Sequence, residues 1–567
     1  MIEFNALTDE WLGVIDQNGN EKLVGLYDYL ANAHHYRRSA ENDFLAIIRV
    51  LQQRLAEVMI MDAFGSSKKT LKKLLDKGYF DPEILDKYFK DVVDFGHSFN
   101  FFDPEHPFLQ TDLKTFKRVF KENAKSTSAA TLNPKMASGN NKVFLHPISA
   151  EEYLKNTDAE DIRNNIYDSV YNPKIHPEDA CKLSFVEYAN CLLISLVISG
   201  SGGKGYSPGL IYAKQLPVMY HLDPSREENL FKSILMNIAF DKLHSAADDK
   251  PLWRWESYED GLNFINNPGL DDIEEGNISI PPKMGMFFPV RYFYPDLSSV
   301  DEKNKTVSRV YKSKMVFEKE TMTLARKQWI ERYEPSVSLK IKKKENEESK
   351  ILGPVCFSET NRSWLDIKSY SNIPGGGTPK SLISFKELDK DLLLQATFGK
   401  PIMTAYYLTM DQAKYLTQGR YQCELPDWLL QNVDTENVVN AITDFISFVE
   451  SRSITLLKDV KDLNKILKSM QEDKKGLKTV EHIVVNRFLR HSEGIFKNKF
   501  LPSILTVKDL NNVDELNKIS KLYREEVHSY SKMLWAQVPV PYGKSIAVQK
   551  KLAELRKERQ NGRKKRN

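Results

Sequence analysis

Cysteine is scarce in this sequence, and no apolar run is long enough to cross a bilayer. The four cysteines lie at no spacing typical of metal ligands or of a redox pair (Cys181, Cys191, Cys356 and Cys423). We therefore expect buried, reduced thiols. Because Met1–Phe4 lacks the basic and apolar regions of a signal peptide, the sequence predicts a cytoplasmic protein without a membrane partner.

Neither sign of charge dominates the chain. Its 81 lysines and arginines nearly balance its 77 acidic residues, so the net charge of +4 identifies no class of partner. Hydrophobic residues at 41% and charged residues at 28% are typical of an ordinary folded protein. A length of 567 residues predicts two or three domains. Local clusters of charge are therefore more informative than the total.

Motifs of catalysis are also missing. The eleven histidines form no zinc-protease or catalytic-triad pattern, and no nuclease-like arrangement of metal ligands is visible. His106 lies between Pro104 and Pro107, which predict an extended ridge, and no nucleophile motif stands near it. We therefore predict a structural role for His106. The sequence predicts no catalytic residue, no metal site and no cofactor.

The first informative stretch is Ser138–Lys142. Gly139, Asn140 and Asn141 readily adopt positive φ, so the backbone can turn sharply there and expose N–H groups. Lys142 adds a cation. A solvated turn is the simpler interpretation of this stretch taken alone. A second glycine-and-lysine loop further along the chain favours a polyanionic ligand instead.

That second loop follows a helix. Ser184 and Glu187 form a capping box, and the next ten residues are almost wholly apolar, which predicts a buried helix. The loop contains Gly202, Gly203 and Lys204 in a defined position after this helix. A nucleotide-binding P-loop is excluded, because a helix rather than a strand precedes and no Ser or Thr follows the lysine. A flexible Gly-Ser linker remains an alternative.

Periodicity divides the chain into two predicted domains. Residues 1–425 contain an apolar helical period over 44–59 and strand-like stretches at 251–256 and 286–294. From Pro426 onward, strand signals give way to long amphipathic periods. The predicted fold is a mixed α/β domain with irregular loops over 1–425, followed by a C-terminal α-helical, four-helix-like bundle over 426–567.

Two further basic segments stand out. Lys303 and Lys305 begin a polar, lysine-rich stretch that suits either a DNA path or a solvated hairpin. The last segment, 543–567, contains ten lysines and arginines against two glutamates. Such a tail attracts nucleic acid without sequence preference, and a solubilising terminus is the equal alternative.

Three stretches in this order resemble a known family: Asn5–Leu12, His106–Gln110 and Ser138–Phe144. They are similar to the large subunit of the type I-E CRISPR surveillance complex, Cascade (the Cse1/CasA family), and the likeness continues to the C-terminus. The resemblance implies a non-catalytic subunit that recognises a protospacer-adjacent motif in double-stranded DNA and helps to open the duplex. The implied partners are crRNA, double-stranded target DNA, the backbone and small Cascade subunits, and a helicase-nuclease.

The resemblance also assigns residues. It implies a motif-sensing loop that contacts the 5′ region of the crRNA, a glycine loop at the minor groove, a lysine finger and a glutamine wedge. These roles fall on Asn140, Asn141 and Lys142, on Gly202, Gly203 and Lys204, on Lys303 or Lys305, and on Gln412 in Met410–Ala413. Some relatives carry a cysteine cluster near the lysine finger that this chain lacks, so the choice of lysine stays open. Gln418 and Gln422 are alternatives for the wedge.

Two other functions stay open. A nucleic-acid-modifying enzyme with a dispersed site would cleave or modify nucleic acid as a purified chain. A structural interaction protein would assemble without affinity for DNA.

Overall fold

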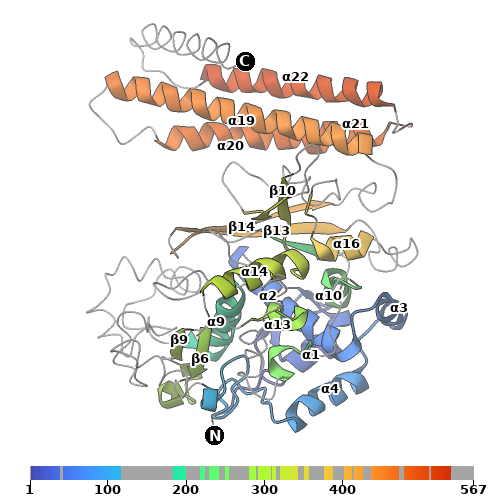
Figure 1. Cartoon of the computed structure of the whole chain (residues 1–567), viewed down its shortest axis with the longest axis vertical. Coiled ribbons are helices and arrows are strands. Elements are labelled where there is room, and N and C mark those ends of the chain that lie inside the picture. Colours follow the sequence, from blue (N-terminus) through green and yellow to red (C-terminus); the bar gives the residue numbers. More distant parts are fainter. Residues whose placement is uncertain are drawn as a thin grey trace. The chain divides into compact units, whose positions relative to one another are not determined.

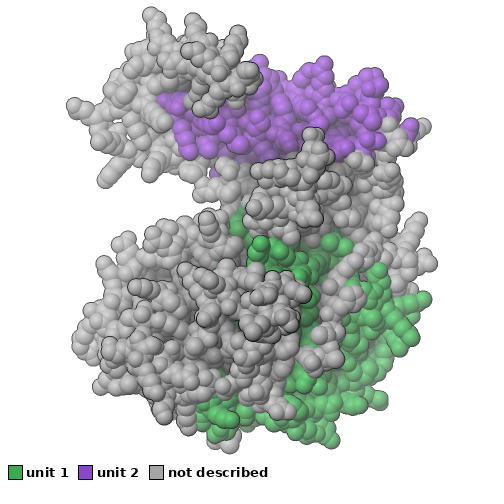
Figure 2. Space-filling model, viewed as in Figure 1, with its two compact units in different colours: residues 1–357, 374–430 green, residues 358–373, 431–567 purple. Residues whose placement is uncertain are grey.

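The computed structural model divides the chain into two compact units (Figures 1 and 2). Unit 1 comprises Met1–Phe357 and Pro374–Leu430, and unit 2 comprises Ser358–Ile373 and Gln431–Asn567. The structure describes residues 2–38, 43–115, 183–198, 218–223, 229–241, 249–254, 280–288, 291–295, 297–307, 310–314, 319–342, 350–356, 376–377, 379–386, 401–411, 414–424, 436–470, 478–507, 509 and 512–537. The mixture of helices and small sheets confirms the mixed helix-and-strand fold class. The predicted division at residue 425 stays a prediction.

Unit 1 begins with an antiparallel sheet in the order β2-β1-β3. Its strands are β1 (Leu12–Ile15), β2 (Glu21–Val24) and β3 (Arg37–Arg38), and α1 (Leu26–Ala31) and η1 (Ala33–His35) separate the last two. The β1–β2 turn forms because Asp16 Oδ1 accepts from the N–H groups of Asn18 and Asn20, at 2.8 and 2.9 Å. Gly19 between them has φ +85°, which glycine adopts without strain.

The central helix of unit 1 is α2 (Asp43–Phe64), and every residue from Ala46 to Met61 is buried. A helix that is buried on all sides lies in the core. Shorter helices follow in sequence as α3 (Lys68–Lys77) and α4 (Pro82–Asp94). Both begin with side-chain caps: Ser67 Oγ accepts from Thr70 N, and Asp81 Oδ1 accepts from Glu83 N.

Helix α9 (Phe185–Val197) packs against α2 and is also buried. The predicted capping box is confirmed, because Glu187 N donates to Ser184 Oγ at 3.2 Å and Ser184 N donates to Glu187 Oε2 at 2.8 Å. The start of α9 is therefore fixed by two reciprocal hydrogen bonds.

The rest of unit 1 consists of short elements and small sheets. The helices are α10 (Leu230–Asn237), η4 (Leu252–Arg254), α13 (Pro282–Met286), η5 (Leu297–Ser299), α14 (Lys319–Arg332) and α16 (Lys380–Lys386). The strands are β4 (Leu183–Ser184), β5 (Met219–Asp223), β6 (Arg291–Pro295), β7 (Val300–Asp301), β8 (Thr306–Val307), β9 (Val310–Lys314), β10 (Leu339–Lys342), β11 (Lys350–Pro354), β12 (Gly376–Gly377), β13 (Ile402–Asp411) and β14 (Lys414–Glu424). They pair in the orders β14-β13-β5, β4-β8-β7, β11-β10-β12 and β6-β9.

Two predicted strands are wrong in part. Residues 252–254 form a 3₁₀ turn in which Arg254 N donates to Pro251 O at 3.0 Å. Residues 282–286 form α13, because Pro282 occupies its first turn, where a missing N–H costs nothing. The strand of this region begins only at Arg291. Aromatic residues dominate both stretches and favour strands by propensity, but prolines determine the local structure.

A close approach joins α13 to α14. A Cβ added to Gly285 would lie 1.9 Å from Nε1 of Trp329, whose indole is fully buried. Only glycine leaves room for the ring.

Unit 2, in its described part, contains three long helices that pack against one another: α19 (Glu436–Met470), α20 (Lys478–Ile495) and α22 (Val513–Gln537). A π-helical turn η6 (Phe496–Phe500) and α21 (Leu501–Leu505) follow α20. The turn brings Phe500 onto Phe445 of α19, with ring centroids 4.3 Å apart. The predicted four-helix-like arrangement stays a prediction, since residues 538–567 lie outside the described part. In the described residues, no helix is long and apolar enough to span a membrane.

Candidate nucleic-acid interface

Most of the predicted contact residues lie outside the described residues: Asn140, Asn141, Lys142, Gly202, Gly203, Lys204 and Gln412. The basic tail at 543–567 also lies outside them. Lys303 and Lys305 are described, and so are elements that border the glycine loop and Gln412. These elements are the described structure next to the predicted contact residues.

Lys303 and Lys305 lie in the turn between β7 and β8, and both side chains are exposed. Asp301 holds the turn by accepting from Asn304 N at 3.1 Å and from Asn304 Nδ2 at 2.7 Å. Lys305 has φ +51°, a left-handed conformation that is uncommon outside glycine. We call residues 302–305 the lysine turn. It presents two cations on a backbone of defined shape.

The lysine turn is attached to the start of α9. Strand β8 pairs with β4, whose last residue Ser184 is the N-cap of α9. In addition, Phe185 N donates to Lys305 O at 3.0 Å. The 13 residues of α9 span about 20 Å, and the glycine loop follows directly after its end. One buried helix therefore joins the lysine turn to the beginning of the glycine loop.

Gln412 lies between the paired ends of two long strands. Strands β13 and β14 are antiparallel from Ile402↔Glu424 to Asp411↔Lys414, with an irregularity between Thr409 and Met410. Only residues 412 and 413 connect them. Near the other end of the hairpin, β13 also pairs with β5.

A partly buried ionic cluster fixes the base of this hairpin. The guanidinium of Arg38 lies 2.5 Å from Asp223 Oδ1 on β5, and it donates to the Tyr406 hydroxyl on β13 at 2.9 Å. Thr404 Oγ1 donates to Asp223 Oδ2 at 2.8 Å. Burial alone would raise the pKa of Asp223, but the Arg38 charge holds it well below the ordinary value. The cluster thus joins β3, β5 and β13 through charge-assisted hydrogen bonds.

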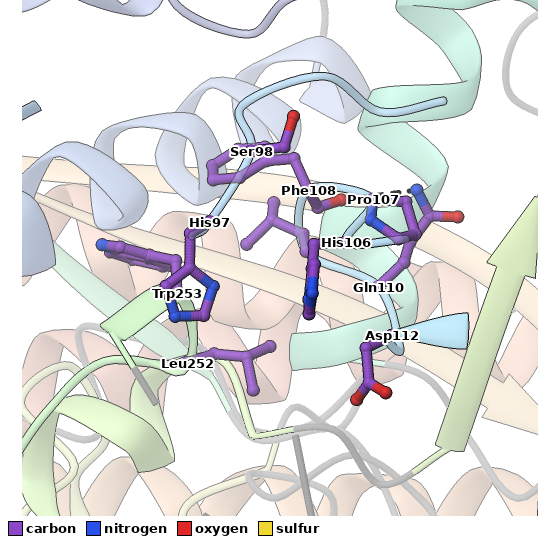
Figure 3. A pocket seen from close by; sticks show the side chains of 10 residues that line it. His97, Ser98, His106, Pro107, Phe108, Gln110, Asp112, Leu252 and Trp253 are labelled. Carbon is purple, nitrogen blue, oxygen red and sulfur yellow. Dashed lines mark hydrogen bonds between the residues drawn. The ribbon is translucent and has the colours of Figure 1, made fainter. Parts of the chain in front are cut away.

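His106 lines a small pocket with His97, Leu252, Trp253 and Asp112 (Figure 3). The rings of His97 and His106 lie 6.1 Å apart, edge to face. Asp112 Oδ1 accepts from Thr115 N at 2.8 Å. The residues around His106 form turns and bends rather than the predicted extended ridge.

The neighbouring Gln110 is buried and ties this segment to the core. Its amide donates to Phe101 O at 2.8 Å and accepts from the Tyr188 hydroxyl of α9. The polar groups of this segment therefore support its own fold. No group of three or more histidines, cysteines or carboxylates capable of holding a metal occurs among the described residues.

Sequence reasoning missed Arg38 and its cluster. Asp223 and Tyr406 lie 185 and 368 positions from Arg38, so no local spacing links the three. Sequence reasoning also missed the lysines of α3, although their signal was local: pairs of lysines alternate with Leu71 and Leu74 at helical spacing.

Comparisons with known proteins agree with one another. The family described as CRISPR-associated protein Cse1 matches residues 5–537. The fold is similar to CasA (Cse1) of Thermus thermophilus, with a TM-score of 0.60 at 16% identity over 98% of each chain. It is also similar to Cse1 of Acidimicrobium ferrooxidans, with a TM-score of 0.60 at 14% identity over 98% of this chain and 99% of that one.

A third similar chain comes from a structure described as a CRISPR RNA-guided surveillance complex. Its TM-score is 0.54 at 15% identity, over 93% of this chain and 100% of that chain. A search of curated proteins found no match. At these identities, the structural matches establish the fold.

Proposed function

Since this chain belongs to the CRISPR-associated Cse1 family, we propose that it is the large subunit of an RNA-guided surveillance complex, Cascade. In this role it recognises a protospacer-adjacent motif in double-stranded DNA, promotes opening of the duplex and recruits a helicase-nuclease. The carrying observation is the family match over residues 5–537, because that range contains the lysine turn, both loops and Gln412. The partners are crRNA, target DNA, and the backbone and small subunits.

The hairpin β13–β14 supports the role of Gln412 as a wedge. Ten residues of β13 pair with β14, and the Arg38 cluster fixes the base. The paired strands therefore form a stiff hairpin that supports the residues connecting their ends. Unstacking a base pair costs a few kcal/mol, and a side chain can fill that gap only if its backbone does not retreat. An amide can also hydrogen-bond to the exposed base edges.

The lysine turn and α9 support the remaining contacts. Lysines attract phosphates whatever the sequence, whereas groups at the base edges must distinguish the motif. In this proposal, Asn140, Asn141, Lys142, Gly202, Gly203 and Lys204 contact the motif region, and Lys303 or Lys305 adds the finger. No catalytic residue is assigned.

The test uses the assembled complex with wild-type protein or with Gln412→Ala. The base pairs beside the protospacer are varied systematically across a series of duplexes. In each duplex the two DNA strands are either complementary or mismatched at the first protospacer positions, so that the DNA there is either closed or already open. Wild-type complex should discriminate among motifs. The Gln412→Ala complex should bind closed duplex about 10-fold more weakly, which corresponds to about 1.4 kcal/mol, and recover on pre-opened DNA.

Gln537→Ala is the control. Gln537 is exposed at the end of α22, outside the hairpin. Its removal should leave both duplexes unaffected. An equal deficit of the Gln412→Ala complex on closed and pre-opened DNA would refute the wedge. Equal affinity of the wild-type complex for all sequences beside the protospacer would refute motif recognition itself.

A further inference from the structure

Helix α3 concentrates positive charge on the surface of unit 1. Its ten residues contain five lysines and one aspartate, a net charge of +4 that equals the formal net charge of the whole chain. Leu71 and Leu74 are buried on the inner face. Lys69, Lys72 and Lys73 are exposed, and their i, i+3, i+4 spacing places them on one outer face. We call these three residues the lysine face.

Helix stability does not account for this charge. Like charges at i and i+4, such as Lys69 and Lys73, weaken a helix. Cations in the first turn, such as Lys69, also oppose the helix dipole, which favours negative groups there. The first turn of α3 contains no acidic residue. The lysine face is therefore retained against the electrostatic preference of its own helix.

The lysine face forms no ion pair in the described residues, although Asp76 stands one turn from Lys72 and Lys73. Across the described ranges of the chain, Lys69, Lys72 and Lys73 make no hydrogen bond or ion pair. Lys77 differs, because its ammonium lies 2.5 Å from Asp81 Oδ2 and 5.0 Å from the centroid of the Tyr79 ring. Three cations on adjacent turns thus remain available for a polyanion.

The helix is held firmly enough to present a fixed pattern of charge. Ser67 caps its start, and Gly78, with φ +80°, ends it. Asp241 contacts the start of α3 twice: its N–H donates to Ser66 O at 2.8 Å, and its Oδ1 accepts from Lys68 N at 3.2 Å. Figure 1 shows α3 at the edge of unit 1, on the side away from α9, β6 and β9. Helix α3 is therefore distant from α9.

We propose that Lys69, Lys72 and Lys73 bind the phosphate backbone of double-stranded DNA outside the motif, an inference that rests on the proposed function. Lysine ammonium groups are point charges that suit phosphate but do not read base edges. The three residues cover about 6 Å of helix axis, and each DNA strand carries one phosphate per about 3.4 Å. The face therefore matches two phosphates of one strand. The contact adds affinity and no sequence preference.

The experiment compares two assembled complexes that lose the same charge at the same i, i+3 spacing. One carries Lys69→Gln with Lys72→Gln on α3, and the control carries Lys87→Gln with Lys90→Gln on α4, where both lysines are also exposed. Affinity for motif-bearing and motif-free duplexes is measured from 50 to 200 mM salt. Each lost phosphate contact lowers the salt slope by about 0.9. Lys73 can still hold one of the two phosphates, so raising the salt from 50 to 200 mM should weaken binding by the α3 variant about 3.5-fold less than it weakens binding by wild type.

The α3 variant should also weaken both duplexes by the same factor and leave motif discrimination intact, whereas the control should match wild type. An unchanged salt slope, or an equal change in the control, would overturn the proposal. Lower guide-RNA content in the α3 variant would identify RNA as the ligand, and normal DNA binding with lost helicase-nuclease recruitment would identify a protein; either result overturns it. A wild-type complex without motif discrimination refutes the proposed function, yet the salt slope on motif-free duplex still tests the lysine face.

Discussion

Some titratable side chains of unit 1 are buried, and Asp249 is the clearest case. Burial raises the pKa of its carboxyl to about 6, and the nearby charge of Asp62 adds to this effect. The N–H of Lys283, which donates to Oδ1 at 2.8 Å, opposes it. The folded pKa lies above the unfolded value of 3.8, so the folded state binds this proton more tightly than the unfolded state does. Lowering the pH through about 6 therefore stabilises the folded state, and the gain is complete below about pH 4.

This shift predicts a pH dependence that Asp249→Asn removes. Between pH 7.5 and pH 5 the contribution of Asp249 to the free energy of unfolding should rise by about 1 kcal/mol, since one pKa unit corresponds to about 1.36 kcal/mol. The advantage of the asparagine variant over wild type should therefore shrink by that amount at pH 5. Urea unfolding at both pH values measures it, with the exposed Asp76→Asn as control. A constant difference between variant and wild type would contradict the shift.

At the scale of single residues, the sequence predicts which side chains are charged but few of their contacts. Lys303 and Lys305 were visible as cations, and both are exposed as a DNA contact requires. The partners of Arg38 and the burial of Asp249 depend on segments far apart in the chain. No single-sequence pattern reports such contacts.

At the scale of elements, local signals performed better. The apolar period over 44–59 predicted α2, and Ser184 with Glu187 predicted the start of α9, because both signals arise within a few helical turns. The strand predicted at 251–256 was wrong over 252–254, and the strand predicted at 286–294 begins only at Arg291, since prolines overrode aromatic propensity. Short pairings such as β4 with β8 join residues over 120 positions apart and had no local signal.

The cap of α9 gives the prediction at this scale. Ser184→Ala removes the acceptor for Glu187 N and should lower the free energy of unfolding by about 1 kcal/mol. It should also increase hydrogen exchange at the Glu187 amide. Ser184→Thr keeps the oxygen and should stay near wild type on both measurements. Unchanged exchange in the alanine variant would show that packing alone fixes the start of α9.

At the scale of the whole molecule, the two units differ in their buried groups. Within the described residues, the buried charged side chains lie in unit 1, among them Arg54, Glu57 and Glu334. The buried polar residues of unit 2 there are serines. Burial would raise the pKa of Glu334, yet the charge of Arg54, 2.8 Å away, lowers it below 4.5. Asp223 is lowered similarly.

Acid should therefore unfold unit 1 before unit 2. A carboxylate whose folded pKa is depressed stabilises the protein above its unfolded pKa, and that stability is lost as the pH falls further. For Asp223 and Glu334 the loss begins below about pH 4. Pepsin at pH 3 should release peptides of α2 and α9 before those of α19 and α22, while digestion at pH 4.5 should leave all four intact. Earlier release of α19 would contradict this order.

The contact between Gly285 and Trp329 has an evolutionary consequence. The indole fills the volume that any side chain at position 285 would need, so neither position can change independently. A relative with a larger residue at the position of Gly285 must have a smaller one at that of Trp329, or a shifted α14. Across the family, these two positions should therefore substitute together, although 44 residues separate them along the chain.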